Sequence, residues 1–403
     1  MAFSPYQKPK RGKKLAIRLG IAAVVLIACG ALIFTFARKK SAGDTSPTTP
    51  SADPTQPTAP NTTVIHYAAA GDLNINDLTV SAGGSGYNYT ETFMDVAHLL
   101  GKADVSSVNF EGNLCGAPYG AGGSAPQEMA VALQKMGVDL VQMANSYSIN
   151  KGLSGLATSL DAVRSAGMEP VGAYATNQEY KESKGYTIKN VQGVRIAFMA
   201  FTKGMDGMAL PVGSENCVNV LYSDYDSAYQ VVNEAKISSV ISAAKKEKPD
   251  IIIAMLHWGS EFNNTVSKTQ ESIVKLMQDK GVDAIIGTHS HYVQKIDFNR
   301  EAGKVVAYSL GDFFSDASRA GSEYSVVLDL EITKDHSTGK AKITNCTYTP
   351  IFTIREKDAP LRVVRIAEMM AAYESGYLDR VSAETYEKMK YALSRVEARV
   401  AGE

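Results

Sequence analysis

A pair of histidines one residue apart follows a short apolar run in the last third of the chain. His289 and His291 lie in the segment IIGTHSHYVQKID, residues 285–297. Two isoleucines and a glycine predict a buried strand that ends in a turn, which places both imidazoles where the chain leaves a sheet. Imidazole is the commonest side-chain ligand of transition metals. Taken alone, however, the pair fits a solvated loop or a structural hydrogen bond better than a metal site.

Other polar side chains also follow apolar segments. Each of them, taken singly, fits a cap, a turn or an ordinary strand end. In an open α/β sheet, however, sites form at the carboxyl ends of the strands, so the recurrence predicts one converging site. A mixed set of nitrogen and oxygen ligands suits Zn, Mn or Fe better than Ca, as one or two ions. The polar residues of this set are Asp72, Asn109, Glu111, Asn145, His257, Glu261, His289, His291 and Asp312.

The elements that must position these residues follow from hydrophobic periodicity. Strands are expected at 63–72, 104–112, 138–146, 168–173, 194–201, 250–259, 282–291, 304–314, 323–333 and 341–352. Helices are expected at 91–103, 127–137, 154–167, 227–247 and 269–281, with two charged helices after Pro360. Strand–helix alternation that closes with consecutive strands predicts a layered α/β fold in which part of the sheet is antiparallel.

The first 63 residues differ in composition from the rest. Residues 19–37 are apolar and uncharged, and their length suits a bilayer span. Six basic residues precede this run and three follow it, which favours a cytoplasmic N-terminus. A lipoprotein cleavage box at LIAC, ending in Cys29, is the alternative. We therefore expect a cytoplasmic basic segment (1–18), a transmembrane anchor (19–37), a Pro/Ser/Thr-rich linker (38–63), an extracytoplasmic α/β domain (64–355) and a C-terminal helical extension (356–403) of a single-pass bacterial membrane protein.

Charge and cysteine content exclude several classes of protein. The net charge is −1, but the first forty residues carry nine of the 41 basic residues and no acid. The remainder has 32 basic against 42 acidic residues, which argues against nucleic-acid binding. Outside the apolar run, Cys115, Cys217 and Cys346 allow at most one disulfide, and no CxxC motif supports a thiolate zinc site.

Six segments, in this order and approximate spacing, resemble the capsule-synthesis CapA family over about residues 64–350. They are GDLNIND, VNFEGNL, MANSYSINKGLSGLATSLDAVRSAGMEPVGA, LHWGSEF, GTHSHYVQKID and YSLGDFF. The resemblance implies a calcineurin-like metallophosphoesterase-type sandwich and a role in poly-γ-glutamate production or export. It also implies membrane synthase subunits as partners, with poly-γ-glutamate or another envelope polymer as the substrate. The metal ligands it implies are Asp72, Glu111, Asn145, His257, His289 and His291, supported by Asn109, Glu261 and Asp312.

Two positions depart from the family pattern. The family usually reads Ala-Asn-Asn-His where this chain has Ala144, Asn145, Ser146 and Tyr147. In strict register Ser146 replaces an amide ligand and Tyr147 the presumed proton-donor histidine, whereas a shift of one residue restores Asn145 as a ligand. The family also commonly reads Gly-Asn-Phe where this chain has Asp312 after its glycine.

These departures leave two hypotheses. In the first, the chain is a metal-dependent hydrolase or transferase with Tyr147 and Asn145 in catalytic positions. Tyrosine, with a pKa of about 10, is a poorer proton donor at neutral pH than histidine, and loss of a general acid costs about 10²- to 10⁴-fold in rate. In the second, the chain binds a polymer or a synthase without catalysis. Because the body is acidic, a polyanionic polymer would need a local cation such as Lys203 or Arg319.

Overall fold

The computed structural model describes residues 61–120, 122–376 and 381–403. The predicted basic segment, anchor and lipoprotein box, and most of the predicted linker, lie outside the described residues. Residues Ala59–Glu403 form one compact unit. Among the described residues, no helix combines the length and apolarity that a membrane span requires.

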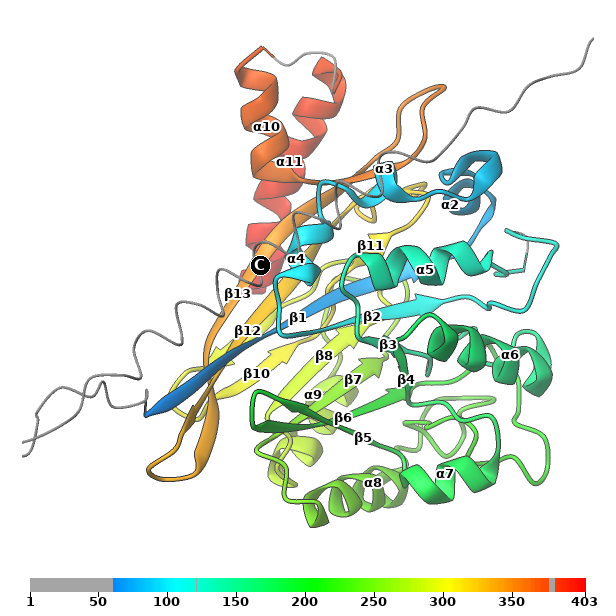
Figure 1. The fold of residues 1–403 in the computed structure, drawn as a ribbon, viewed down its shortest axis with the longest axis vertical. Helices are drawn as coiled ribbons and strands as arrows, with labels where there is room; N and C mark the ends of the chain where they lie inside the picture. Colours follow the sequence, from blue (N-terminus) through cyan, green and yellow to red (C-terminus); the bar gives the residue numbers. More distant parts are fainter. Residues whose placement is uncertain (1–60, 121, 377–380) are drawn as a thin grey trace, which may run out of the picture. The chain divides into compact units, whose positions relative to one another are not determined.

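The first sheet has eight strands and contains the amino-terminal strand of the unit (Figure 1). β1 (Thr62–Asn74) is parallel to β2 (Val105–Glu111), and β3 (Leu140–Gln142) and β4 (Glu169–Val171) continue the parallel side. On its other side β1 is antiparallel to β12, and a short strand, β11, also pairs with β1. The remaining strands of this sheet are β11 (Asp312–Phe314), β12 (Tyr324–Asp335), β13 (Lys340–Ile354) and β14 (Arg362–Arg365).

The second sheet has six strands in the order β5-β6-β7-β8-β10-β9. Its four central strands are parallel and its two edge strands antiparallel, so both sheets are mixed, as predicted. The strands are β5 (Thr187–Val191), β6 (Val194–Thr202), β7 (Ile251–His257), β8 (Ala284–Thr288), β9 (Ile296–Asn299) and β10 (Lys304–Ala307).

Alternating side chains of β6 divide between two hydrophobic cores. Ile196 and Phe198 belong to the core shared with the first sheet, and the Phe198 ring lies 5.4 Å from that of Tyr67 on β1. Ala197 and Phe201 belong to a second core. Successive side chains of a strand point to opposite faces, so a strand that is apolar throughout can be buried on both sides. The two sheets therefore form the inner layers of an α/β sandwich.

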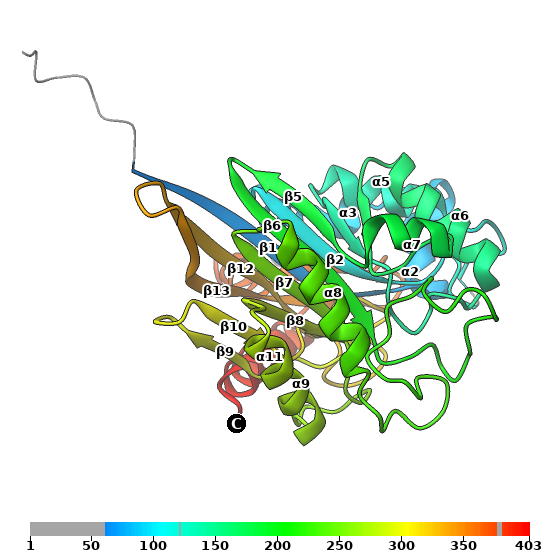
Figure 2. The same cartoon turned by 90° about the horizontal axis from the view of Figure 1, so that it is seen from below.

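Helices cover the outer faces of both sheets. α8 (Glu234–Lys246) and α9 (Lys268–Asp279) contribute buried residues to the second core and lie along the second sheet (Figure 2). α10 (Ile366–Glu374) and α11 (Ala383–Ala401) contact β13 of the first sheet. The other helices are α2 (Asp77–Ser81), α3 (Thr90–Phe93), α4 (Ala97–Gly101), α5 (Gln127–Lys135), α6 (Gly152–Ser165) and α7 (Asn177–Ser183), with a 3₁₀ turn at Gly84–Gly86.

Several predicted elements have different bounds. The helix expected at 227–247 begins only at Glu234, because Asp224 accepts hydrogen bonds from the backbone N–H groups of Gln230 and Val231 and holds the preceding residues in a loop. The helix expected at 91–103 is divided into α3 and α4. The strand expected at 304–314 splits between the two sheets as β10 and β11. The predicted C-terminal helical extension also contributes β14 to the first sheet.

The strands β5 and β9 and the helix α7 were not predicted from sequence. The three cysteines of the described residues, Cys115, Cys217 and Cys346, are free thiols.

Candidate metal centre

Buried polar side chains converge at the carboxyl ends of strands from both sheets. Asp72 lies near the end of β1, and Glu111 ends β2. His257 ends β7, and His289 and His291 follow β8. Ligand atoms gather in two groups, and within each group they lie within 4.8 Å of one another. The first group is Glu111, His257 and His289, and the second is Asp72, His291 and Asp312.

The first group contains a histidine nitrogen without a partner. Nε2 of His257 lies 2.6 Å from Oε1 of Glu111, and its Nδ1 lies 3.4 Å from Oγ1 of Thr202. The rings of His257 and His289 have centroids 4.3 Å apart. Nε2 of His289 is buried and has no hydrogen-bond partner among the described residues. Burial lowers the pKa of both histidines, which keeps them neutral, the form that binds metals.

The second group is built around an imidazole and two carboxylates. Nδ1 of His291 lies 2.8 Å from Oδ1 of Asp312 and 4.0 Å from Oδ2 of Asp72. Burial lowers the pKa of His291, but Asp312, together with Glu111 and Asp72, outweighs this effect and raises the pKa to about 10. Oδ1 of Asp312 also accepts a hydrogen bond of 3.1 Å from Nδ2 of Asn74.

An amide network joins the two groups. Nδ2 of Asn109 donates to Oδ1 of Asp72 at 2.7 Å and to Oε1 of Glu111 at 3.1 Å. The backbone N–H of His289 donates to Oδ2 of Asp72 at 2.9 Å. Asn109 is in turn oriented by Nδ2 of Asn145, which donates to its Oδ1 at 3.1 Å. The two groups therefore form one polar cluster.

The backbone around the cluster is unusual at three places. His289 has φ +87° and His291 has φ +58°, in the left-handed region that non-glycine residues rarely adopt. A Cβ atom at Gly71 would lie 1.9 Å from the carbonyl oxygen of Gly311, so only glycine allows β1 to approach β11 here. The N–H of Asp72 donates to this same carbonyl at 3.0 Å. This contact brings the second group together.

The cluster fits a divalent cation. Three carboxylates are buried close together, and burial followed by the charge of Glu111 raises the pKa of Asp72. Burial is also the main reason that the pKa of Glu111 rises to about 7. Buried acidic groups are stabilised by a cation, and Nε2 of His289 lies beside them without a hydrogen-bond partner among the described residues. The nitrogen and oxygen donors are therefore compatible with a divalent metal.

Asn145, Ser146 and Tyr147, which stand where the family usually has Asn-Asn-His, have different surroundings. Oδ1 of Asn145 accepts from the backbone N–H of Tyr147 at 3.0 Å, and its Nδ2 donates to Oδ1 of Asn109 and to the carbonyl of Phe110. Ser146 lines a cleft together with His289. The pKa of Tyr147 is raised to about 12, chiefly by burial and next by the charge of Glu111. These contacts are compatible with either register of the family pattern, with Asn145 or Ser146 in the position of the amide ligand.

A cleft of about 270 Å³ opens beside the first group. Glu261 and Lys203 line it and were singled out from sequence, whereas Asp206, Tyr229 and Ser260 were not. The missed residues belong to loops that carry no local signal for a site. Asn74 was also missed, although it lies two residues after Asp72 on the same strand. The lining residues are Ser146, Lys203, Gly204, Asp206, Tyr229, Ser260, Glu261 and His289.

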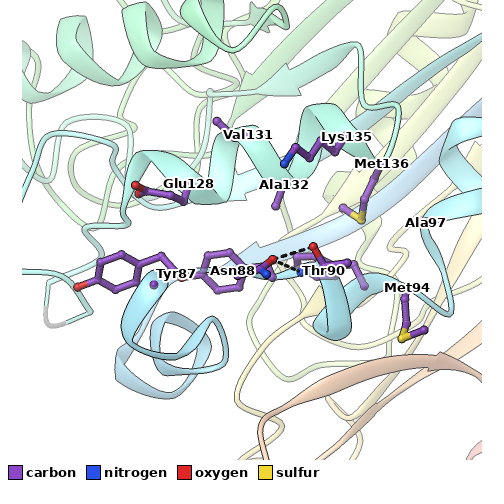
Figure 3. A pocket seen from close by; sticks show the side chains of 13 residues that line it. Tyr87, Asn88, Thr90, Met94, Ala97, Glu128, Val131, Ala132, Lys135 and Met136 are labelled. Carbon is purple, nitrogen blue, oxygen red and sulfur yellow. Dashed lines mark hydrogen bonds between the residues drawn. The ribbon is translucent and has the colours of Figure 1, made fainter. Parts of the chain in front are cut away.

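A second cavity of about 340 Å³ lies away from this chemistry. It is lined by residues 86–97 and by α5, including the partly exposed Met94 and Val131 (Figure 3). Glu128 and Lys135 are the charged residues of its lining. None of the six residues of the two groups contributes to it. It is therefore separate from the candidate metal centre.

Comparison with known proteins gives the family. The model of the bacterial capsule synthesis protein family PGA_cap matches residues 65–317. The chain belongs to this family. The capsule biosynthesis protein CapA of Bacillus anthracis is 27% identical over 260 residues, which cover 62% of this chain and 60% of that protein. The PGA biosynthesis protein CapA of Bacillus subtilis is 27% identical over 218 residues, which cover 54% of this chain and 53% of that protein. The resemblance predicted from the six segments is confirmed.

The solved structures that align with this chain share little sequence with it. A phosphatase from Mycoplasma pneumoniae aligns with a TM-score of 0.42 and 13% identity, covering 72% of this chain and 94% of that one. A hypothetical protein from Thermus thermophilus aligns with a TM-score of 0.41 and 12% identity, covering 71% of this chain and 98% of that one. Family membership rests on the sequence match, and the match spans about three fifths or less of the two curated Bacillus relatives.

Proposed function

We propose that the chain is a metal-dependent component of poly-γ-glutamate capsule synthesis or export, anchored in the bacterial membrane by residues 19–37. Membership of the capsule-synthesis family, and its similarity to the capsule and PGA biosynthesis proteins of two Bacillus species, support poly-γ-glutamate as the polymer concerned. The apolar run, the basic residues before it and the Pro-rich linker support an extracytoplasmic domain on a tether.

The observation that carries the metal-dependent part is the unpaired Nε2 of His289 beside two groups of buried donors. In this proposal Glu111, His257 and His289 would hold one ion. Asp72, Asp312 and His291, the last after loss of its proton, would hold a second. Zn, Mn or Fe suits this donor set better than Ca. A bound divalent cation would supply Lewis-acid polarisation of the bond to be broken.

The chain's own residues then have distinct tasks. Asn109 fixes the carboxylates of Asp72 and Glu111 through two hydrogen bonds, and Asn145 fixes Asn109. Ser146 and Lys203 line the cleft in which a substrate would lie against His289. Tyr147 occupies the position of a proton donor. With a pKa of about 12 it donates poorly at neutral pH, so hydrolysis of a phosphoester or γ-glutamyl bond is expected to be slow.

The same tyrosine favours a second candidate function, in which the cleft binds a polymer or a synthase subunit without turnover. Because a binding protein needs no general acid, the loss of histidine at position 147 would carry no penalty. Both candidates use the metal centre, and they differ only in turnover.

Metal analysis of the purified full chain, followed by assays on phosphodiesters and γ-glutamyl peptides, tests the proposal. We expect one or two equivalents of a transition metal and a low but measurable hydrolysis rate that a chelator abolishes. Metal without hydrolysis would favour the second candidate. Protein that binds no metal, and whose stability is unchanged by added metal, would contradict both.

A further inference from the structure

Lys203 places an ammonium group in the cleft beside the metal centre. Its backbone N–H donates to the carbonyl of His257 at 2.7 Å, and its Nζ donates to the carbonyl of Gly259 at 2.9 Å. The same Nζ lies 4.8 Å from the centroid of the Tyr229 ring. An ammonium has three N–H donors, and two of them make no hydrogen bond with the described residues. Lys203 is thus held at its backbone and at its ammonium group, and two N–H donors of that group are left for a ligand.

Two carboxylates line the same cleft without pairing with this lysine. Asp206 and Glu261 are exposed and make no hydrogen bond or ion pair with any residue of the described part of the chain. Burial lowers the pKa of Lys203, whereas the charges of Glu261 and Asp206 oppose this effect. The cleft therefore presents one positive and two negative groups, all available to a ligand.

The loops that carry these groups are held in uncommon conformations. Asp206 has φ +49°, Tyr229 has φ +55°, and Phe262, next to Glu261, has φ +52°. Such conformations cost free energy in non-glycine residues and cluster at ligand sites. His289, whose buried Nε2 is unpaired among the described residues, also lines this cleft, so a ligand in the cleft would lie directly beside the metal centre.

We propose that this cleft binds the amino-terminal unit of a γ-linked glutamyl chain, with its α-carboxylate on Lys203 and its α-ammonium between Asp206 and Glu261. This inference rests on the proposed function for the identity of the polymer, and it adds that the chain end is recognised. Only the terminal unit carries an ammonium beside its carboxylate. An internal unit would bring negative charge alone against two carboxylates, which disfavours it. The first γ-amide would then lie against His289.

Calorimetric titration of the full chain with three dipeptide probes tests this inference. The probes are γ-glutamylglutamate, its N-acetyl form, and the form in which the first α-carboxylate is a carboxamide. Because each modification removes one charge-assisted contact, we expect each to weaken binding by about 10- to 100-fold. Equal or tighter binding of the N-acetyl form, or no binding of any probe, would overturn the inference.

Two variants assign the contacts to residues. Lys203→Met should weaken binding of the unmodified dipeptide about 10-fold or more, yet it should leave binding of the carboxamide form almost unchanged. The double variant D206N/E261Q should bind the free and N-acetyl forms equally. Lys236→Met is the matched control, because Lys236 also lies over a tyrosine ring, at 3.6 Å from the centroid, but outside the cleft. A loss with Lys236→Met equal to that with Lys203→Met would contradict the assignment.

The probes separate failure of this inference from failure of the proposed function. Stoichiometric metal with hydrolysis of internal or N-acetylated bonds would leave the proposed function intact and remove chain-end recognition. If protein without metal or turnover still bound the free dipeptide selectively, the inferred specificity of the cleft would stand and the proposed metal-dependent function would be contradicted.

Discussion

Replacing Tyr147 with histidine should increase the hydrolysis of substrates with poor leaving groups. Burial, followed by the nearby Glu111, raises the pKa of Tyr147 to about 12, whereas an unperturbed histidine titrates near 6.5. A general acid matched to neutral pH contributes about 10²- to 10⁴-fold in rate. We therefore expect kcat/KM for an alkyl phosphodiester or a γ-glutamyl peptide to rise about 10²-fold at pH 7, which corresponds to about 2.7 kcal/mol in activation free energy.

Leaving-group dependence distinguishes this explanation from a general improvement of the site. A p-nitrophenyl ester needs little protonation as it departs, so Tyr147→His should change its hydrolysis far less than that of the alkyl ester. The gain should also decline as pH rises through the imidazole pKa, a limb that the wild type lacks. Tyr147→Phe is the control, because it removes the hydroxyl and supplies no acid. Equal gains for both leaving groups, or no gain for either, would refute the assigned role of position 147.

Four further predictions concern the metal centre and the core. His289→Ala should remove the ion held by the first group, a loss of about one equivalent by elemental analysis, and with it the stabilisation of about 2.7 kcal/mol that this ion would give the wild type at a metal concentration 100 times its Kd. The raised pKa of His291 contributes stability that is full below pH 6.5 and lost as pH rises through about 10. Asp312→Asn should therefore cost about 2 kcal/mol of unfolding free energy at pH 6.5 in chelator, and less above pH 10. Glu111, with its pKa raised to about 7 chiefly by burial, should make the metal-free protein less stable as pH rises from about 4.5 through 7, and urea unfolding of Glu111→Gln should lack this decline. Trp258→Ala should cost about 3–5 kcal/mol, because it empties a fully buried site and removes the indole hydrogen bond to the carbonyl of Tyr308.

Matched substitutions outside the cluster serve as controls for these variants. His98→Ala on α4 should retain metal, and Asp279→Asn on the surface of α9 should not change the pH dependence. Val212→Ala, at an almost fully exposed position, should alter stability by less than about 0.5 kcal/mol. A metal content of His289→Ala equal to that of the wild type, or a pH profile of Asp312→Asn or Glu111→Gln that follows the wild type, would contradict the corresponding prediction. The prediction for the core would be contradicted if Trp258→Ala lowered the free energy of unfolding by no more than Val212→Ala does.

Local sequence determined most of the elements that carry the site. The continuous apolar runs before His257 and His289 predicted strands buried on both faces, and the structure has β7 and β8 there. The polar residues after these runs predicted a site at strand ends, because a buried strand must end where polar side chains can be accommodated. Family membership also followed from six short segments, since their residues and order are themselves sequence properties.

Only the tertiary structure decided which of these residues meet. Asp312 was expected within one long strand, but the chain leaves the second sheet after β10 and enters the first as β11, which brings Asp312 beside Asp72. The amide of Asn145, a ligand in the sequence-based prediction, donates to Asn109, which is a contact that only the folded chain creates. The division into two groups of three ligands also depends on how the two sheets face each other.

The loops of the cleft were the least predictable part of the site. Lys203 and Asp206 follow β6 in a segment without hydrophobic periodicity, and Tyr229 lies in the loop that replaces the start of the helix predicted at 227–247. These residues meet Glu261 and His289 because β6, β7 and β8 are neighbours in the second sheet. Hydrophobic periodicity records which face of an element is buried and where that element ends. Pairing between strands depends on contacts between residues far apart in the chain, which no local pattern encodes.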